Sequence, residues 1–179
     1  MTIDLKQNYF ELFGLPEQFE IDSSALTKAF LSLQNQWHPD RFATASDEQR
    51  RISMQNTSFI NEAHDTLKSP RLRARYLLEL AGVSFSDETE TSNDPVFLMQ
   101  QMELRESIDD VVNADDPFDK LDNIRKEVKT QVQQLETDFQ QHYHAGELDK
   151  AKDSVLKMRF MERIFNEIRQ LEEKLEDEY

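Results

Sequence analysis

The sequence NQWHPDRFA, residues 35–43, separates two stretches whose apolar residues have helical spacing. Before it, apolar residues recur every three or four positions, at Leu26, Phe30, Leu33 and Trp37. After it, Ser46 and Gln49 form a capping box that begins a second helix. The side chains of this helix expected to face the core are Ile52, Phe59, Ile60, Ala63 and Leu67. Because Pro39 cannot continue a helix, we expect an antiparallel helical hairpin with the tripeptide His-Pro-Asp at its exposed tip.

Glycine and proline mark the ends of the other helical patterns. A short helix in NYFELFG ends at Gly14, and Pro70 begins a helix that Gly82 ends. Three longer patterns follow, at about 95–113, 117–145 and 147–175. The second carries Phe118, Leu121, Val128, Val132, Leu135 and Phe139 on one side, and the third carries Ala151, Val155, Met158, Phe165 and Ile168 at near-heptad spacing.

No stretch alternates in the manner of a strand, so the sequence predicts an all-α protein. We expect a helical hairpin with short flanking helices in residues 1–76 and a three-helix bundle in residues 95–179. Between them, residues 77–94 contain a helix end and the acidic stretch VSFSDETETSND, which predicts a linker or long loop. Residues 1–82 hold 9 Lys and Arg against 11 Asp and Glu, whereas residues 83–179 hold 12 against 25. This asymmetry also indicates two modules with different surfaces.

The formal net charge of −15 argues against nucleic acid and anionic membranes as partners, since phosphate binding relies on basic surface. Cysteine is absent, which excludes disulfides and cysteine-ligated metals within the chain. The N-terminal sequence MTIDLKQNYF lacks the features of a signal peptide, and no apolar run approaches about 18 residues. We therefore expect a cytoplasmic protein.

His38 and Asp40 allow three interpretations. As an acid–base pair they lack a Ser or Cys nucleophile in a recognisable setting, and Pro39 orients them apart as often as together. As metal ligands they supply at most two of three or four, and no sequence pattern ties His64, His142 or His144 to them. Alternatively, Pro39 ends a helix and its neighbours are ordinary loop residues. We expect no catalytic residue, no metal and no cofactor.

The surroundings of the tripeptide resemble the J-domain family, the co-chaperones of DnaK-type chaperones. The resemblance lies in YFELFGLP (9–16), LTKAFLSLQNQWHPDRF (26–42) and FINEAHDTLKSPRLRARYLL (59–78). It implies that the protein is not an enzyme. It also implies that His38, Pro39 and Asp40 dock on the chaperone and trigger its ATP hydrolysis. Members of the family usually carry several basic residues on the helix before the tripeptide, whereas this chain offers only Lys28 there and Arg41 after it.

The sequence VFLMQQMELRESIDDVV, residues 96–112, has two helical faces. At about 100° per residue, its core face contains Phe97, Leu104, Ile108, Val111 and Val112. Away from that face lie Leu98, Met99 and Met102, with Glu106 near them and Glu103 and Arg105 on their flanks. These apolar residues either pack against a second helix or form a protein-binding patch. In KMRFMERIF (157–165), Phe160 is likewise expected opposite the core stripe and exposed.

FLMQQMELRESID and MRFMERI resemble the corresponding segments of HscB-type J-proteins. The resemblance covers nearly the whole chain and implies an L-shaped, monomeric two-module protein. Its implied partners are an HscA-like DnaK-type chaperone and an IscU-type iron–sulfur scaffold protein. The implied scaffold-binding residues are Leu98, Met99, Met102, Glu103, Arg105, Glu106 and Phe160. A general J-protein that presents unfolded clients is the alternative, favoured by a broad apolar groove rather than a small patch.

Overall fold

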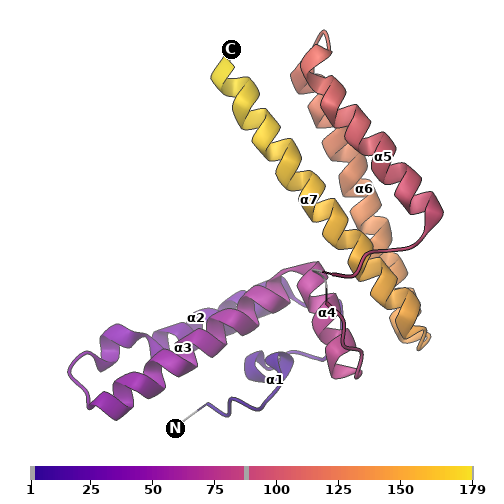
Figure 1. Cartoon of the computed structure of the whole chain (residues 1–179). Helices are drawn as coiled ribbons and strands as arrows, with labels where there is room; N and C mark the ends of the chain where they lie inside the picture. Colours follow the sequence, from indigo (N-terminus) through magenta and orange to yellow (C-terminus); the bar gives the residue numbers. More distant parts are fainter. Residues whose placement is uncertain (1–2, 87–88, 179) are drawn as a thin grey trace. The chain divides into compact units, whose positions relative to one another are not determined.

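A computed structural model describes residues 3–86 and 89–178, and all regular secondary structure in these ranges is helical. The prediction of an all-α fold is confirmed. The chain divides into two compact units, Met1–Leu80 and Ala81–Tyr179. The first contains α1 (Tyr9–Phe13), α2 (Ser23–Trp37), the 3₁₀ turn η1 (Pro39–Phe42), α3 (Asp47–Lys68) and α4 (Pro70–Leu80). The second contains α5 (Pro95–Asp109), the 3₁₀ turn η2 (Asp110–Asn113), α6 (Pro117–His144) and α7 (Leu148–Glu178) (Figure 1).

In the first unit, α2 and α3 lie side by side as an antiparallel hairpin (Figure 1). Asp22 caps the start of α2 by accepting the backbone N–H groups of Ser24 and Ala25. The predicted capping box of Ser46 and Gln49 is present at the start of α3. The core of the unit is apolar and combines residues from all four helices, Phe10, Phe13, Leu26, Ile60, Ala63, Leu67, Leu77 and Leu78.

The end of α2 is fixed by side chains of α3. A helix leaves its last carbonyl groups without partners inside the helix. Here the carbonyl of Trp37 accepts hydrogen bonds from the Ser53 hydroxyl at 2.7 Å and the Thr57 hydroxyl at 2.9 Å. The Trp37 ring is buried and stacks on Phe42 with 5.9 Å between ring centroids. Both flanks of the tripeptide are therefore anchored to the body of the unit.

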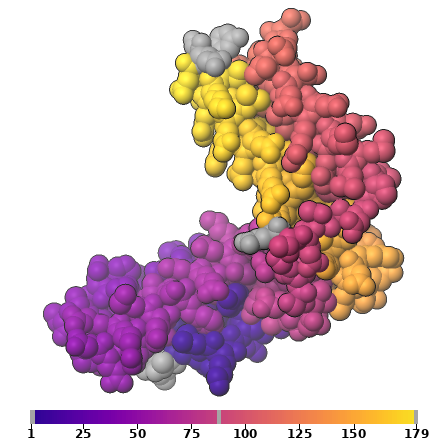
Figure 2. Space-filling view, in the orientation of Figure 1, coloured from indigo at the N-terminus to yellow at the C-terminus, as the bar shows by residue number. Residues whose placement is uncertain are grey.

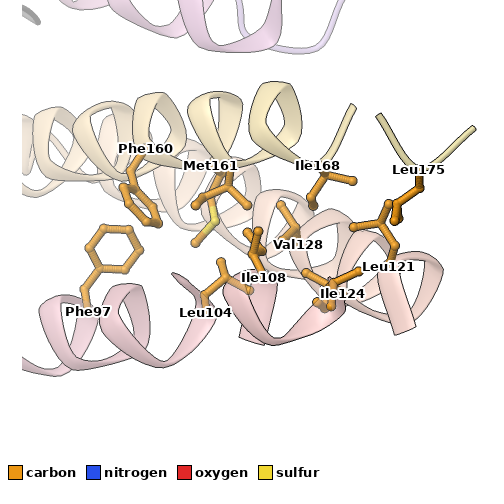
Figure 3. Packing of buried hydrophobic residues seen from close by; sticks show 12 residues of the cluster. Phe97, Leu104, Ile108, Leu121, Ile124, Val128, Phe160, Met161, Ile168 and Leu175 are labelled. Atoms are coloured by element: carbon orange, nitrogen blue, oxygen red, sulfur yellow. The ribbon is translucent and has the colours of Figure 1, made fainter. Parts of the chain in front are cut away.

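In the second unit, α6 and α7 pack along much of their length, and α5 lies against them. Their shared core contains residues of all three helices and of η2. Figure 3 shows how these side chains meet. The members are Phe97, Leu104, Ile108, Val111, Leu121, Ile124, Val128, Phe160, Met161, Ile164, Ile168 and Leu175.

Two residues expected to point inward are exposed instead, Val112 at 58% and Phe118 at 40%. Val112 follows the end of α5, where the chain turns as a 3₁₀ helix with about three residues per turn. That tighter turn keeps Val111 buried and rotates Val112 outward. On α6, Phe118 and Ile124 lie on opposite sides of the buried Leu121. The core covers the side of Ile124, so Phe118 is left at the surface.

The described part of the acidic stretch between α4 and α5 contains no helix, yet parts of it pack on α7. Phe85 is buried, with the Lys152 ammonium 5.3 Å from its ring centroid, and Lys152 also pairs with Glu90. Asp94 caps α5 and pairs with Lys157 at 2.7 Å. The hydrogen bond from Lys157 holds the pKa of Asp94 below its ordinary value. The expected linker is thus held to the bundle at these points, while Asp87 and Glu88 lie outside the described residues.

Replacing Ser53 by Ala is expected to destabilise the α2–α3 hairpin by about 1–2 kcal/mol, because the buried Trp37 carbonyl loses one of its two donors. Hydrogen exchange at the α2 and α3 amides measures this loss, with the amides of α6 as an internal reference. Ser58→Ala, at an exposed position of α3, is the matched control and should leave protection unchanged. Equal protection in the Ser53 and Ser58 variants would contradict the anchoring role.

Replacing Asp94 by Asn keeps a helix-capping acceptor but removes the charge that Lys157 binds. Since the folded pKa of Asp94 is lowered, its contribution is present above the ordinary carboxyl pKa of 3.8 and is lost as the pH falls through the folded value. Wild type should exceed the variant in free energy of unfolding at neutral pH, and the difference should shrink below pH 3.8. Urea unfolding followed by circular dichroism tests this. A difference independent of pH would contradict it.

Candidate protein-binding sites

The tripeptide at the tip of the hairpin forms a compact polar surface. His38 ends α2, and its Nδ1 accepts the backbone N–H of Asp40 at 3.3 Å. The same Nδ1 lies 3.6 Å from Asp40 Oδ2. The sequence left open whether Pro39 orients the two side chains apart or together, and the structure brings them together. Pro39 begins a 3₁₀ turn, and this tight turn brings Asp40 back toward the imidazole of His38.

The side chains of the tripeptide are open to solvent, that of His38 at 51% and that of Asp40 at 91%. Arg41 adjoins them, but its Nη1 donates to the carbonyl of Asn35 at 2.7 Å and so helps to cap α2. Lys28 is exposed on α2, ten residues before His38 and hence about 15 Å away along the helix axis. The structure thus brings together four of the five chaperone-binding residues inferred from the sequence and leaves Lys28 apart.

Within residues 3–86 and 89–178, no three His, Asp or Glu side chains are grouped closely enough to hold a metal ion. Among the same residues, no helix has the length and apolar content that crossing a bilayer requires.

A second candidate surface lies on α5. Leu98, Met99 and Met102 are exposed at 42%, 64% and 65%, so of the two alternatives the structure favours an exposed apolar face over packing against a second helix. Glu103, Arg105 and Glu106 are exposed beside them. Figure 2 shows this segment at the surface of the second unit. We call a group of exposed residues of this helix the α5 surface, namely Val96, Leu98, Met99, Met102, Glu103, Arg105 and Glu106.

Val96 was missed by the sequence reasoning, although it is exposed at 66%. It lies three residues before Met99 and therefore on the same side of the helix. Val96 is the second residue of α5, so no helical residues precede it except Pro95, and the apolar pattern could be followed only toward the C-terminus. The helical wheel contained the signal, since Val96 falls outside the core face that Phe97 defines.

Phe160, expected at the surface, is buried at 8% exposure. Its ring and that of Phe97 form an edge-to-face pair with 5.7 Å between centroids and 83° between planes (Figure 3). The Arg105 guanidinium lies 5.5 Å from the Phe160 ring centroid. The correction has a simple cause: α7 contacts both α5 and α6, so its buried arc is wider than a single stripe. Phe160 supports the α5 surface from beneath and is not a member of it.

Comparisons with known proteins identify the family of the chain. A family model described as the HSCB C-terminal oligomerisation domain matches residues 93–169. The co-chaperone protein HscB homolog of Aliivibrio salmonicida is 44% identical over 176 residues, covering 94% of this chain and 98% of that protein. The homolog of Vibrio parahaemolyticus is 42% identical over 168 residues with the same coverage.

Solved structures extend the similarity to the fold. The chaperone HscB from Vibrio cholerae matches with a TM-score of 0.86 at 40% identity, over 94% of this chain and 99% of that one. Human co-chaperone protein HscB matches with a TM-score of 0.87 at 26% identity, over 96% of this chain and 85% of that one. Because relatives above 40% identity match along nearly its whole length, the chain belongs to the HscB family of co-chaperones.

Proposed function

We propose that this protein stimulates the ATPase of a specialised, HscA-like DnaK-type chaperone and delivers an IscU-type iron–sulfur scaffold protein to it. In this role it assists iron–sulfur cluster maturation in the cytoplasm, as a monomer and without catalysing a reaction itself. The observation that carries the proposal is that each of the two units presents its own exposed surface. One is the polar tip at His38, Pro39 and Asp40, and the other is the α5 surface.

The tip suits docking on the chaperone for two physical reasons. Its backbone is anchored through Trp37 and by Arg41, so little conformational entropy is lost on binding. The Asp40 carboxylate is almost fully exposed and can accept a charge-assisted hydrogen bond from an arginine of the chaperone. Neither property requires the basic helix face that α2 lacks.

The α5 surface suits a folded client. Its apolar side chains occupy a single helix, and two of them are methionines, whose flexible thioethers adapt to a partner. Acidic residues adjoin them. The hollow beside α5 and a second one between α6 and α7 are lined largely by Asp, Gln and Lys, which does not favour long apolar segments of an unfolded chain. A specific scaffold is therefore preferred to general clients. Because one chain carries both contacts, engagement of one raises the effective concentration of the other.

Changing His38 to Gln is expected to abolish most of the stimulation of steady-state ATP hydrolysis by an HscA-like chaperone, since the tip loses a ring that contacts the partner. His144→Gln makes the same chemical change at an exposed residue of the other unit and should retain stimulation. If wild type fails to stimulate, or if both variants stimulate equally, the assignment of the tip is wrong.

Replacing Leu98, Met99 and Met102 together by Ala is expected to weaken scaffold binding by at least about tenfold, through loss of exposed apolar contact area. Phe160 is left intact because its truncation would open a cavity in the core. Isothermal titration calorimetry measures the affinity, and circular dichroism confirms the fold. The control is Val112→Ala, an equally exposed apolar residue beyond the end of α5, which should bind as wild type does. Retained affinity in the triple variant would place the client elsewhere.

A further inference from the structure

Two hollows on the bundle join into one groove beside α6. The first, of ≈ 260 Å³, lies between the start of α5, α6 and α7, and the second, of ≈ 410 Å³, continues between α6 and α7. Three residues line both of them, Leu135, Asp138 and Lys157. The second hollow extends to His142 and Asp149, which flank the turn between the two helices. We call these two adjoining hollows together the α6 groove.

Side-chain amides line the first part of the groove, Gln100 from α5 and Gln131 and Gln134 from α6. Gln131 and Gln134 are three residues apart and so share one face of the helix. Each uses one N–H within α6, Gln131 toward Glu127 at 3.1 Å and Gln134 toward Asp138 at 2.8 Å. An amide offers both donors and an acceptor, which matches the alternating N–H and C=O groups of an extended peptide backbone.

The groove is also negatively charged. Its lining contains the carboxylates of Asp94, Asp138, Asp149 and Asp153 and the ammonium groups of Lys150 and Lys157. Lys157 pairs with Asp94 at 2.7 Å and with Asp153 at 2.8 Å, and Lys150 pairs with Glu147 at 2.8 Å.

The excess charge is concentrated at two positions. In the ranges that the structure describes, neither lysine pairs with Asp138 or Asp149. Residues 83–179 carry 25 acidic against 12 basic residues, so the surrounding surface adds to the same sign. A basic segment is the charge-complementary occupant, and an anionic one such as nucleic acid is repelled.

The groove is continuous with the α5 surface, because Val96 belongs to both. We propose that the α6 groove holds an extended, lysine- or arginine-rich segment of the partner whose folded part binds the α5 surface. The amides of Gln100, Gln131 and Gln134 bind its backbone, and Asp138 and Asp149 bind its basic side chains. The proposal rests on the proposed function, since it assigns the segment to the client.

The test uses a short blocked peptide of alternating Lys and Ala, and an alternating Glu and Ala peptide as its matched control. Added to the whole protein, the Lys peptide is expected to shift the side-chain amide NMR signals of Gln100, Gln131 and Gln134, and the Glu peptide is not. The double variant Asp138→Asn/Asp149→Asn should bind the Lys peptide about fivefold more weakly. Asp109→Asn/Asp115→Asn, the same charge change at exposed residues near the other end of α5, should bind it as wild type does.

Two results overturn the proposal: no shift at the three glutamines, or an equal loss of affinity in both double variants, which indicates only non-specific attraction to an acidic surface. A further titration with an IscU-type scaffold separates the two levels of inference. If wild type and the Asp138/Asp149 double variant bind the scaffold equally, the groove does not hold the client and the proposed function stands. If wild type does not bind the scaffold at all, the proposed function itself is wrong.

Discussion

The edge-to-face contact between Phe97 and Phe160 fixes how α5 is rotated about its own axis. Once Phe97 points at α7, the 3.6-residue period also directs Leu104 and Ile108 into the core. The same rotation leaves Leu98, Met99 and Met102 with no place in the core, so they face solvent. Burial of one aromatic pair and exposure of the neighbouring apolar residues are thus two results of a single geometric constraint. The Arg105 guanidinium lies over the Phe160 ring and so makes a further contact between α5 and α7.

The first unit follows a comparable logic with polar groups. The hydroxyls of Ser53 and Thr57 complete the end of α2, and η1 can then begin at once without leaving the Trp37 carbonyl buried and unpaired. The outcome is a tight polar turn held on a rigid base. In both units an exposed surface depends on a buried contact directly behind it, which gives each surface a defined shape before any partner arrives.

Much of this could be predicted from the sequence, because the signals are local. The capping box of Ser46, the positive-φ glycine that ends α1, and the prolines that open α4, α5 and α6 all act within one helical turn. The position of Met99 and Met102 away from the core face also followed from periodicity, whereas the absence of a covering helix needed the structure. Phe160 could not be placed this way, since its burial depends on which two helices flank α7. Val112 was misplaced because the pattern was extended through a change from α to 3₁₀ geometry. For His38 and Asp40, the backbone turn at Pro39 decided a proximity that residue types left open. The roles in binding assigned to these residues stay predictions.

The position of Trp37 has a practical consequence. It is the chain's only tryptophan, it immediately precedes His38, and its ring stacks on Phe42 just past the tripeptide. Its indole therefore sits beneath the surface proposed to meet the chaperone, with 8% of the residue exposed. The natural sequence in this way contains an intrinsic fluorophore at the tip of the hairpin. Its emission can follow events there in the unlabelled protein, without a dye on the residues under study.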